Sequence, residues 1–343
     1  MHLAMSPLSL SLSLFRYRNP AERIANAGPV EITCGVRQLV GCDFKGCVTQ
    51  ITLADVGLQV SGNMEKMAPF PDLKVLDIDG YCEAQMSIGG VCTGIFQGDI
   101  EPFVEGVNKD LDYLSMRGTF LSGDGSVLTS LPSLTHLDLY GNMEVEGDLN
   151  PFLGGATGLQ YLNLMSTCTK VNTKSLGNLK ELIFLNLHSW GGQIGYKGCK
   201  NWMTPMAQGP LSDISGLSKL QYLDLTNWKS EGTMSDFSKM ENLQALYAGN
   251  FDGSLKITGS LSDISNLKNL ETLLLSKLDI SINMDELSDF PKLTSLTIFD
   301  VSQVSGDVSE VCSLESMNNL QLTGVQGASC GQVPCLDTCG ITS

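Results

Sequence analysis

The sequence predicts an α/β-type solenoid of about 11 turns, in which every turn adds one short strand to a parallel β-sheet. The first observation behind this prediction is the string Leu-x-x-Leu-x-Leu, which recurs along most of the 343 residues. The second is its spacing, because Leu134, Leu159 and Leu182 follow one another at 25 and 23 residues. The third is a Gly-x-aliphatic step that returns at about twice that interval. Turns of this length must stack on one another to bury a continuous core.

Each copy of the string is expected to form one strand, with the residues at positions one, four and six pointing into the core. Full copies begin at Leu73, Leu111, Leu134, Leu159, Leu182, Leu220, Leu270 and Leu293, and looser copies begin at Val48, Leu243 and Met317. Because successive side chains of a strand point to opposite faces, positions three, five and seven should lie on the exposed face of the sheet.

The Gly-x-aliphatic steps mark the other side of the solenoid. They begin at Gly98, Gly147, Gly209, Gly259 and Gly306. Gly98 and Gly147 are 49 residues apart and Gly209 and Gly259 are 50 apart, so the period of this pattern is a pair of turns. Glycine suits a sharp bend where the backbone leaves the strand, and the aliphatic residue two places later should point inward.

With these motifs the chain resembles the leucine-rich repeat family, and its glycine steps are similar to the L-x-G-x-I turns of plant and protist members. The resemblance covers residues 48–324. It implies a horseshoe with a parallel β-sheet on the concave face and a mostly irregular, short helical or extended convex side.

The chain departs from this family at the ninth position of the repeat, where asparagine normally satisfies inward-facing backbone groups. Asparagine is present there only as Asn142. Other turns carry different residues at the equivalent site, namely Thr119, Thr167, Trp190, Trp228 and Leu278. Water, threonine hydroxyls or different turns must therefore satisfy the backbone groups in those turns.

Eleven cysteines are many for a cytosolic protein of this size, and most of them lie outside the repeats. Disulfides are expected in an N-cap at 34–47, in a C-cap at 325–343 and in one loop, because terminal turns have no neighbour to cover their core. The candidate disulfide cysteines are Cys34, Cys42, Cys47, Cys82, Cys92, Cys330, Cys335 and Cys339. Their spacing lacks the C-x2-C knuckles of zinc sites, so no metal is expected. The bracketing cysteines are similar to the caps of extracellular family members.

Residues 1–33 are expected to be an N-terminal leader or extension. Met1 to Phe15 form an apolar Ser/Leu stretch of signal-peptide length, and Ala25-Asn26-Ala27 resembles a cleavage site. The arginines follow this stretch instead of preceding it, so an organelle transit peptide and an unprocessed tail remain alternatives. The chain has no Asn-x-Ser/Thr sequon, which does not favour a heavily glycosylated ectodomain. Together with the cysteines, these features favour a secreted, extracellular or organelle-lumen protein over a cytosolic one.

The net charge of −16 would repel a phosphate backbone, so nucleic acid is not an expected partner. No uninterrupted apolar run approaches the roughly 20 residues that a membrane-spanning helix needs. No transmembrane segment is therefore expected.

Two steps between repeats are longer than the others. Leu73 to Leu111 and Leu182 to Leu220 both span 38 residues, which places insertions near 81–94 and 188–202. Both begin just after a strand, so they should project from the same rim. Either they flank a bound partner or they are neutral insertions, which solenoids accept at surface turns.

The exposed face of the predicted sheet carries three columns of side chains in the central turns. The third position holds rings, the fifth holds acids and amides, and the seventh adds Tyr140 and His188. The candidate partner-binding residues are Tyr113, His136, Asp138, Tyr140, Tyr161, Asn163, Phe184, Asn186, His188, Tyr222 and Asp224. Exposed aromatics beside hydrogen-bonding groups often anchor interfaces, since they bury a large area at small entropic cost. The alternative is that rings on neighbouring strands stack and stabilise the sheet.

Neither catalysis nor a cofactor is expected. Ser115, His136 and Asp138 face the same way, but an open sheet offers no oxyanion hole and no pocket that excludes water. His136 and His188 lie two turns apart, which does not suit a metal site. The glycines follow the repeat period and do not form a phosphate-binding loop.

The sequence thus predicts a non-enzymatic module that binds a protein or peptide through the concave face of its central repeats. The first alternative is a structural or accessory subunit of a larger hetero-complex, held by its caps, its insertions and its N-terminal segment. The second is carbohydrate binding, because tyrosine and tryptophan with aspartate and asparagine also suit sugars.

Overall fold

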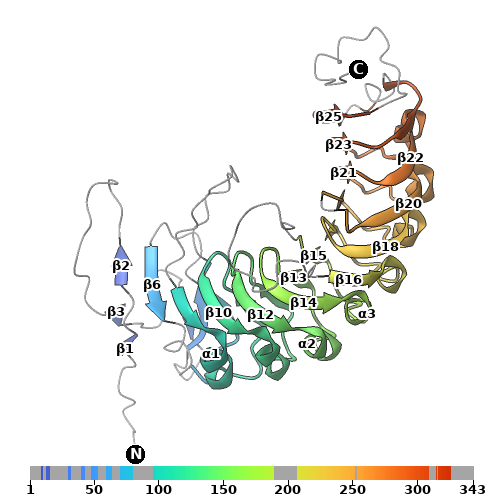
Figure 1. Ribbon diagram of the computed structural model, residues 1–343. Coiled ribbons are helices and arrows are strands. Elements are labelled where there is room, and N and C mark those ends of the chain that lie inside the picture. Colours follow the sequence, from blue (N-terminus) through green and yellow to red (C-terminus); the bar gives the residue numbers. More distant parts are fainter. Residues whose placement is uncertain are drawn as a thin grey trace, which may run out of the picture. The chain divides into compact units, whose positions relative to one another are not determined.

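The computed structural model describes residues 48–52, 59–63, 70–79, 96–188, 207–251, 253–308, 314 and 316–325, together with four short strands before residue 43. The chain divides into two compact units, Met1–Leu159 with Ser166–Thr169 and Gln160–Met165 with Lys170–Ser343. In each unit the repeats stack in chain order, as Figure 1 shows, and the predicted solenoid is confirmed. Most of the predicted leader, most of both caps and nearly all of both insertions lie outside the described residues.

The Leu-x-Leu segments form one sheet in each unit, which we call the leucine sheet. In unit 1 its strands are β4 (Val40–Cys42), β5 (Val48–Thr52), β7 (Val75–Asp77), β9 (Tyr113–Ser115) and β11 (His136–Asp138). In unit 2 they are β13 (Tyr161–Asn163), β15 (Phe184–Asn186), β17 (Tyr222–Asp224), β19 (Ala245–Gly249), β21 (Thr272–Ser276), β23 (Ser295–Phe299) and β25 (Asn319–Thr323). Within the leucine sheet of each unit the strands pair in parallel, as expected when successive turns of a solenoid run in the same direction. The exception is β4, which pairs antiparallel with β5.

A second sheet accompanies the leucine sheet in each unit, and it is more regular than the expected convex side. In unit 1 its strands are β2 (Ser13–Phe15), β6 (Gln59–Asn63), β8 (Phe96–Asp99), β10 (Phe120–Asp124) and β12 (Glu144–Asp148). The division between the units falls within β14 (Cys168–Asn172), which is also a strand of the second sheet. In unit 2 the second sheet contains β16 (Ala207–Pro210), β18 (Lys229–Thr233), β20 (Lys256–Ser260), β22 (Asp279–Asn283) and β24 (Gln303–Ser305). An antiparallel pair of β1 (Ser9–Leu10) and β3 (Val30–Glu31) stands apart from both sheets.

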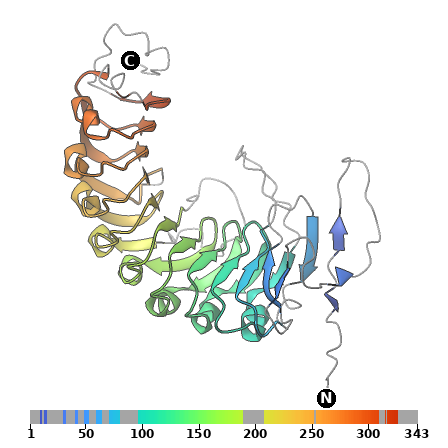
Figure 2. The same cartoon turned by 180° about the vertical axis from the view of Figure 1, so that it is seen from behind.

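A short helix follows each strand of the second sheet from β8 to β22. The α-helices are α1 (Ile100–Gly106), α2 (Asn150–Gly155) and α3 (Thr173–Leu176), and the 3-10 helices are η2 (Gly125–Ser130), η4 (Leu211–Asp213), η5 (Met234–Phe237), η6 (Leu261–Ile264) and η7 (Met284–Asp289). Many begin at a capping side chain; for example, the Asp99 carboxylate accepts from the Glu101 backbone N–H at 3.1 Å. Figure 2 shows the helical segments of unit 2 (yellow to orange) along one side of its stack and the strands along the other.

The leucines of the repeat form the core, as predicted. In the turn of β11, for example, Leu134, Leu137 and Leu139 are all 0% exposed. Side chains of the short helices close the opposite side of this core, among them Phe103 of α1 and Phe152 of α2. The Leu-x-x-Leu-x-Leu pattern therefore predicts directly which side chains are buried on folding.

The ninth position is satisfied in more than one way. Asn142 is 1% exposed; its amide nitrogen donates to the carbonyls of Met116 and Leu139, and its amide oxygen accepts from the Leu121 N–H. The Thr119 hydroxyl takes over one such bond by donating to the Met116 carbonyl at 2.8 Å, as expected. Trp228 instead fills its turn with a fully buried ring whose Nε1 has no hydrogen-bond partner.

The glycines of the Gly-x-aliphatic steps have positive φ but lie farther along the turn than expected. Gly98, Gly147, Gly209 and Gly259 lie inside strands of the second sheet, and Gly306 directly follows one, with φ between 85° and 131°. Gly123 has the same conformation, so a glycine with positive φ also occurs in a turn that lacks the Gly-x-aliphatic step. A side chain at Gly123 or Gly147 would collide with a capping carboxylate of the preceding turn, Asp99 or Asp124 respectively. The capping carboxylate of one turn therefore lies against the glycine of the next turn, where there is no room for a side chain.

Candidate functional site

Rings at the third position of the repeat form a stacked row on the outer face of the leucine sheet in each unit. In unit 1 the rings of Tyr113 and His136 stack with centroids 3.9 Å apart and planes 12° apart. In unit 2 Tyr161 stacks on Phe184 at 4.2 Å and 8°, and Phe184 stacks on Tyr222 at 4.3 Å and 13°. The residues of each pair are direct partners in the strand register, and parallel strands are about 4.8 Å apart, so ring stacking matches the sheet spacing.

The row of unit 2 includes a fourth ring, Tyr247, which the sequence analysis missed. Tyr247 lies in β19 at the fifth position of its repeat and pairs in register with Asp224. The third position of that repeat is Ala245, which leaves room for Tyr247 to contact Tyr222 at 5.3 Å with a 40° tilt. The signal was present in the sequence as a tyrosine where other central turns have an acid or an amide. We call Tyr161, Phe184, Tyr222 and Tyr247 the ring row.

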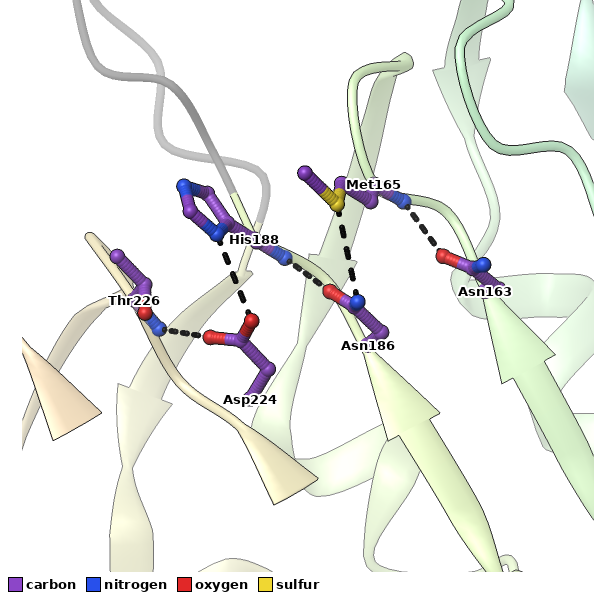
Figure 3. Close-up of polar contacts among 6 residues, drawn as sticks. All are labelled: Asn163, Met165, Asn186, His188, Asp224 and Thr226. Atoms are coloured by element: carbon purple, nitrogen blue, oxygen red, sulfur yellow. Dashed lines mark hydrogen bonds and ion pairs between the residues drawn. The ribbon is translucent and has the colours of Figure 1, made fainter. Parts of the chain in front are cut away.

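The acids and amides of the fifth position are not exposed, which corrects the expectation that they stand on the surface beside the rings. Ser115, Asp138, Asn163, Asn186 and Asp224 are between 2% and 7% exposed. Four of them turn back and accept a hydrogen bond from the backbone N–H two residues later; Figure 3 shows three of these bonds, from Met165, His188 and Thr226. This is an Asx turn, in which a short polar side chain replaces a backbone acceptor.

These Asx turns decide the length of the strands. Every strand of unit 2 with Asn or Asp at the fifth position is 3 residues long, as in β13, β15 and β17. Where Tyr247, Leu274, Thr297 or Gln321 occupies that position, the strand is 5 residues long. The polar column therefore shapes the sheet, because its side chains end the strands.

The seventh position places further groups at the end of each strand. In unit 2 the His188 Nδ1 lies 3.4 Å from an Asp224 carboxylate oxygen, and the Asn186 amide nitrogen lies 3.7 Å from the Met165 sulfur (Figure 3). In unit 1 the Arg117 guanidinium lies over the half-buried Tyr140 ring, 4.8 Å from its centroid. Tyr140 and His188 thus remain at the surface, whereas Asp138, Asn163, Asn186 and Asp224 lie beneath it.

Partial burial of the rings shifts their protonation. Burial lowers the pKa of His136 to about 4. Burial, followed by the charges of Asp77, Asp79 and Asp138, raises the pKa of Tyr113 to about 12. In the ring row, burial and then the Asp224 charge raise the pKa of Tyr222 and Tyr247, the latter countered in part by a hydrogen bond with Thr272. At neutral pH all these rings are therefore uncharged and able to stack.

Stability should fall on acidification because of His136. The unfolded chain takes up a proton on His136 near the ordinary pKa of 6.5, whereas the folded chain takes it up only near 4. Between these two pH values the free energy of unfolding should therefore fall by about 2–3 kcal/mol. Replacing His136 by Phe, which keeps a ring but removes the titration, should flatten this part of the profile. Urea unfolding between pH 7 and pH 4 measures this dependence. If the free energy of unfolding falls equally in the wild type and in His136→Phe, the prediction is wrong.

The contacts around Ser115 differ from those of a Ser-His-Asp triad. Its hydroxyl donates to the Asp79 carboxylate, so its proton is not shared with His136. The Asp138 carboxylate accepts from the Tyr140 backbone N–H at 2.9 Å. Among the described residues there is no group of three or more His, Cys, Asp or Glu side chains that could hold a metal ion.

Most candidate disulfide cysteines lie outside the described residues, and of the eight only Cys42 falls in a described strand, β4. A cysteine that the sequence analysis left out, Cys168 of β14, is disulfide-bonded. It was missed because it lies inside the array and not in a cap. No helix within the described ranges is long and apolar enough to span a membrane.

No protein-family model and no curated protein matches the chain. Solved structures do. The ectodomain of the Arabidopsis receptor kinase HAESA, in complex with an N-terminally extended IDA peptide hormone, is similar with a TM-score of 0.61 and 20% identity over 89% of this chain and 47% of that one. HAESA with IDA and the co-receptor SERK1 gives 0.53 and 17%, over 84% and 48%. A TDR receptor gives 0.53 and 20%, over 76% and 40%. The chain thus spans less than half the length of these structures.

Proposed function

We propose that this chain, which has the leucine-rich repeat fold in both of its units, is a non-catalytic module that recognises a protein or a peptide. The observation that carries the proposal is the ring row on the outer face of the leucine sheet of unit 2. Its four rings come from four neighbouring strands, and all four are partly exposed. Aromatic residues in such a position are the usual anchors of protein interfaces.

The ring row is held in place before any partner arrives. Phe184 has a ring stacked on each face, and the Asx turns fix the ends of β13, β15 and β17. A surface that is already ordered loses little conformational entropy when it binds, so more of the contact energy becomes affinity. What the row offers to a partner is a ridge of ring edges and tyrosine hydroxyls.

The similar structures support a peptide partner. Two of them are complexes of the HAESA receptor with the IDA peptide hormone, and they share the fold of this chain at 17–20% identity. We include a secreted or extracellular location in the proposal, in line with the cysteine-rich ends of the sequence and with the ectodomain nature of the HAESA structure.

Carbohydrate binding is the weaker alternative. A sugar ring stacks on an open aromatic face, but both faces of Phe184 and one face of Tyr161 are covered by neighbouring rings. The alternative of a structural subunit depended on the insertions and caps, which fall mainly outside the described residues. No observation supports either alternative as strongly as the ring row supports peptide or protein recognition.

The proposal is tested by panning a random displayed peptide library on the native chain and measuring the affinity of the enriched peptides by calorimetry. We expect Tyr161→Ala and Tyr222→Ala to weaken binding about tenfold or more each, since anchor residues typically contribute more than 1–2 kcal/mol. Phe120→Ala is the matched control, because Phe120 is an aromatic residue of the second sheet that is 57% exposed. Circular dichroism confirms that each variant is folded.

Unchanged affinity in both ring-row variants, or an equal loss in Phe120→Ala, would contradict the proposal. A glycan array that gave hits sensitive to Tyr222→Ala, with no enriched peptides, would replace it by carbohydrate binding.

A further inference from the structure

A second aromatic surface lies at the ends of β19, β21 and β23, beyond the ring row. Phe251 is 41% exposed and, with Phe120, is one of two large apolar side chains that are exposed among the described residues. The rings of Phe251 and Phe299 are 6.5 Å apart with a tilt of 46°. The Lys277 ammonium lies over the Phe299 ring, 5.7 Å from its centroid. We call these three residues the rim cluster.

Hydrogen bonds of its own backbone and of the preceding residue hold the exposed Phe251. Its backbone N–H donates to the Asn227 side chain at 2.9 Å. The preceding residue, Asn250, donates through its amide nitrogen to the Lys277 carbonyl at 3.1 Å and accepts from the Leu255 N–H at 3.0 Å. Because the Phe251 backbone is already held in place, its exposed ring would lose little conformational entropy on binding.

The floor between the two phenylalanines contains an unpartnered polar group. Gly249, Ser276 and Phe299 are consecutive partners in the strand register, and the Phe251 ring lies close over Gly249. The Ser276 side chain is 0% exposed, and its hydroxyl has no hydrogen-bond partner. A buried hydroxyl of this kind lowers the stability of the free protein, so the surface above it is not optimised for stability alone.

Lys277 also carries a backbone cost. It is the eighth residue of its repeat and has φ 54°, a left-handed conformation. Glycine adopts this conformation without strain at the equivalent Gly118, Gly141 and Gly324, and Ser166, Asn227 and Asp300 adopt it in other turns. A lysine is less favourable than a glycine in this conformation. What the lysine side chain adds is a cation placed over the Phe299 ring.

Two carboxylates that are close to the rim cluster in sequence, Asp279 and Asp300, have contacts other than Lys277. Asp279 accepts from the Gln303 side chain at 3.2 Å. Asp300 lies against Gly324, in the turn on the far side from Lys277. Among the described residues no carboxylate forms an ion pair with Lys277. The net charge of −16 acts weakly here, because the screening length at physiological salt is about 8 Å.

From these contacts we propose that the rim cluster is a docking point for a peptide segment that carries an acidic side chain next to an apolar one. The apolar side chain packs on Phe251 and Phe299, and the carboxylate pairs with the Lys277 ammonium. Burial of the aromatic surface strengthens that ion pair by excluding water. The inference rests on the proposed function in taking a peptide as the partner, but its residues are separate from the ring row.

The test uses synthetic peptides taken from the library panned on the native chain. Peptides with an acidic residue next to an aromatic or aliphatic residue should be enriched, and their affinity should fall at least fivefold in Phe251→Ser and in Lys277→Glu. Lys256→Glu is the matched control, since Lys256 is an exposed lysine of the second sheet. A peptide whose acid is replaced by lysine should lose affinity for the wild type and regain it for Lys277→Glu.

A further variant separates recognition from folding. Lys277→Gly should raise the melting temperature, because it removes the left-handed strain, and should still weaken the acidic peptides. Reversed charges that fail to restore binding, or Lys277→Glu and Lys256→Glu with equal effects, would overturn the inference.

The outcomes also separate this inference from the proposed function. Loss of binding in Tyr222→Ala with full binding in Phe251→Ser refutes the rim cluster and leaves the ring row standing. Loss of binding in Phe251→Ser with full binding in Tyr222→Ala refutes the ring row and leaves the rim cluster standing. If panning enriches no peptide, both proposals fail.

Discussion

Replacing Asn142 by alanine is expected to lower the free energy of unfolding of unit 1 by about 3 kcal/mol. The Asn142 side chain is almost fully buried and links two turns through bonds to Met116, Leu139 and the Leu121 N–H. The carbonyls of Met116 and Leu139 keep other donors, but the Leu121 N–H would be left buried without an acceptor. One orphaned donor costs about 1–3 kcal/mol, and the lost amide bonds add to it. Urea unfolding and the exchange rate of the Leu121 amide measure the effect.

Asn242→Ala is the matched control for this prediction. Asn242 is exposed and donates one bond, to the Ser218 carbonyl at 2.8 Å, so its loss should change stability by less than about 1 kcal/mol. Equal losses in the two variants would mean that the buried asparagine contributes nothing beyond a surface bond.

Replacing Gly147 by alanine should destabilise the chain by about 3 kcal/mol, for a reason of shape. Gly147 has φ 105°, and a Cβ there would collide with the Asp124 carboxylate. That carboxylate caps η2 by accepting from the Ser126 N–H at 2.9 Å. The variant must bear backbone strain of about 1–3 kcal/mol and also displace a cap of about 1 kcal/mol. Thermal and urea unfolding followed by circular dichroism measure the loss.

Gly154→Ala is the same substitution at a site where we expect the opposite effect on stability. Gly154 lies in α2 with ordinary helical φ, and nothing lies within 4 Å of an added Cβ. Alanine should leave stability unchanged or raise it by about 0.5–1 kcal/mol, because a helical glycine loses more entropy on folding. A stable Gly147→Ala variant would show that the cap can move without penalty.

The positions of the leucines were enough to predict the leucine sheet, because burial of a repeated apolar pattern leaves few alternatives. Leu134, Leu137 and Leu139 are buried where the string requires it. The same alternation placed the rings of Tyr161 and Phe184 on one outer face, and their stacking follows from the strand spacing.

Other features were hidden from the sequence for identifiable physical reasons. The strands of the second sheet have weak strand propensity, as in β12 (Glu144–Asp148) and β18 (Lys229–Thr233), and neighbouring turns impose their extended form. Alternation places Asp138 and Asn186 outward but does not reveal that each turns back to bind its own backbone. Tyr247 was missed because it enters the ring row from a different position of the repeat.

The two strand lengths of the leucine sheet divide unit 2 into regions with different modes of fluctuation. In the turns of β13, β15 and β17 the seventh-position amide is protected by a side chain of its own turn, so it can exchange with solvent when that turn alone opens. In β19, β21, β23 and β25 the seventh residues pair with one another across the strands, and their amides exchange only when neighbouring turns open together. The rim cluster stands on this second region, where motion is cooperative, and a ligand bound there would slow amide exchange across several turns at once.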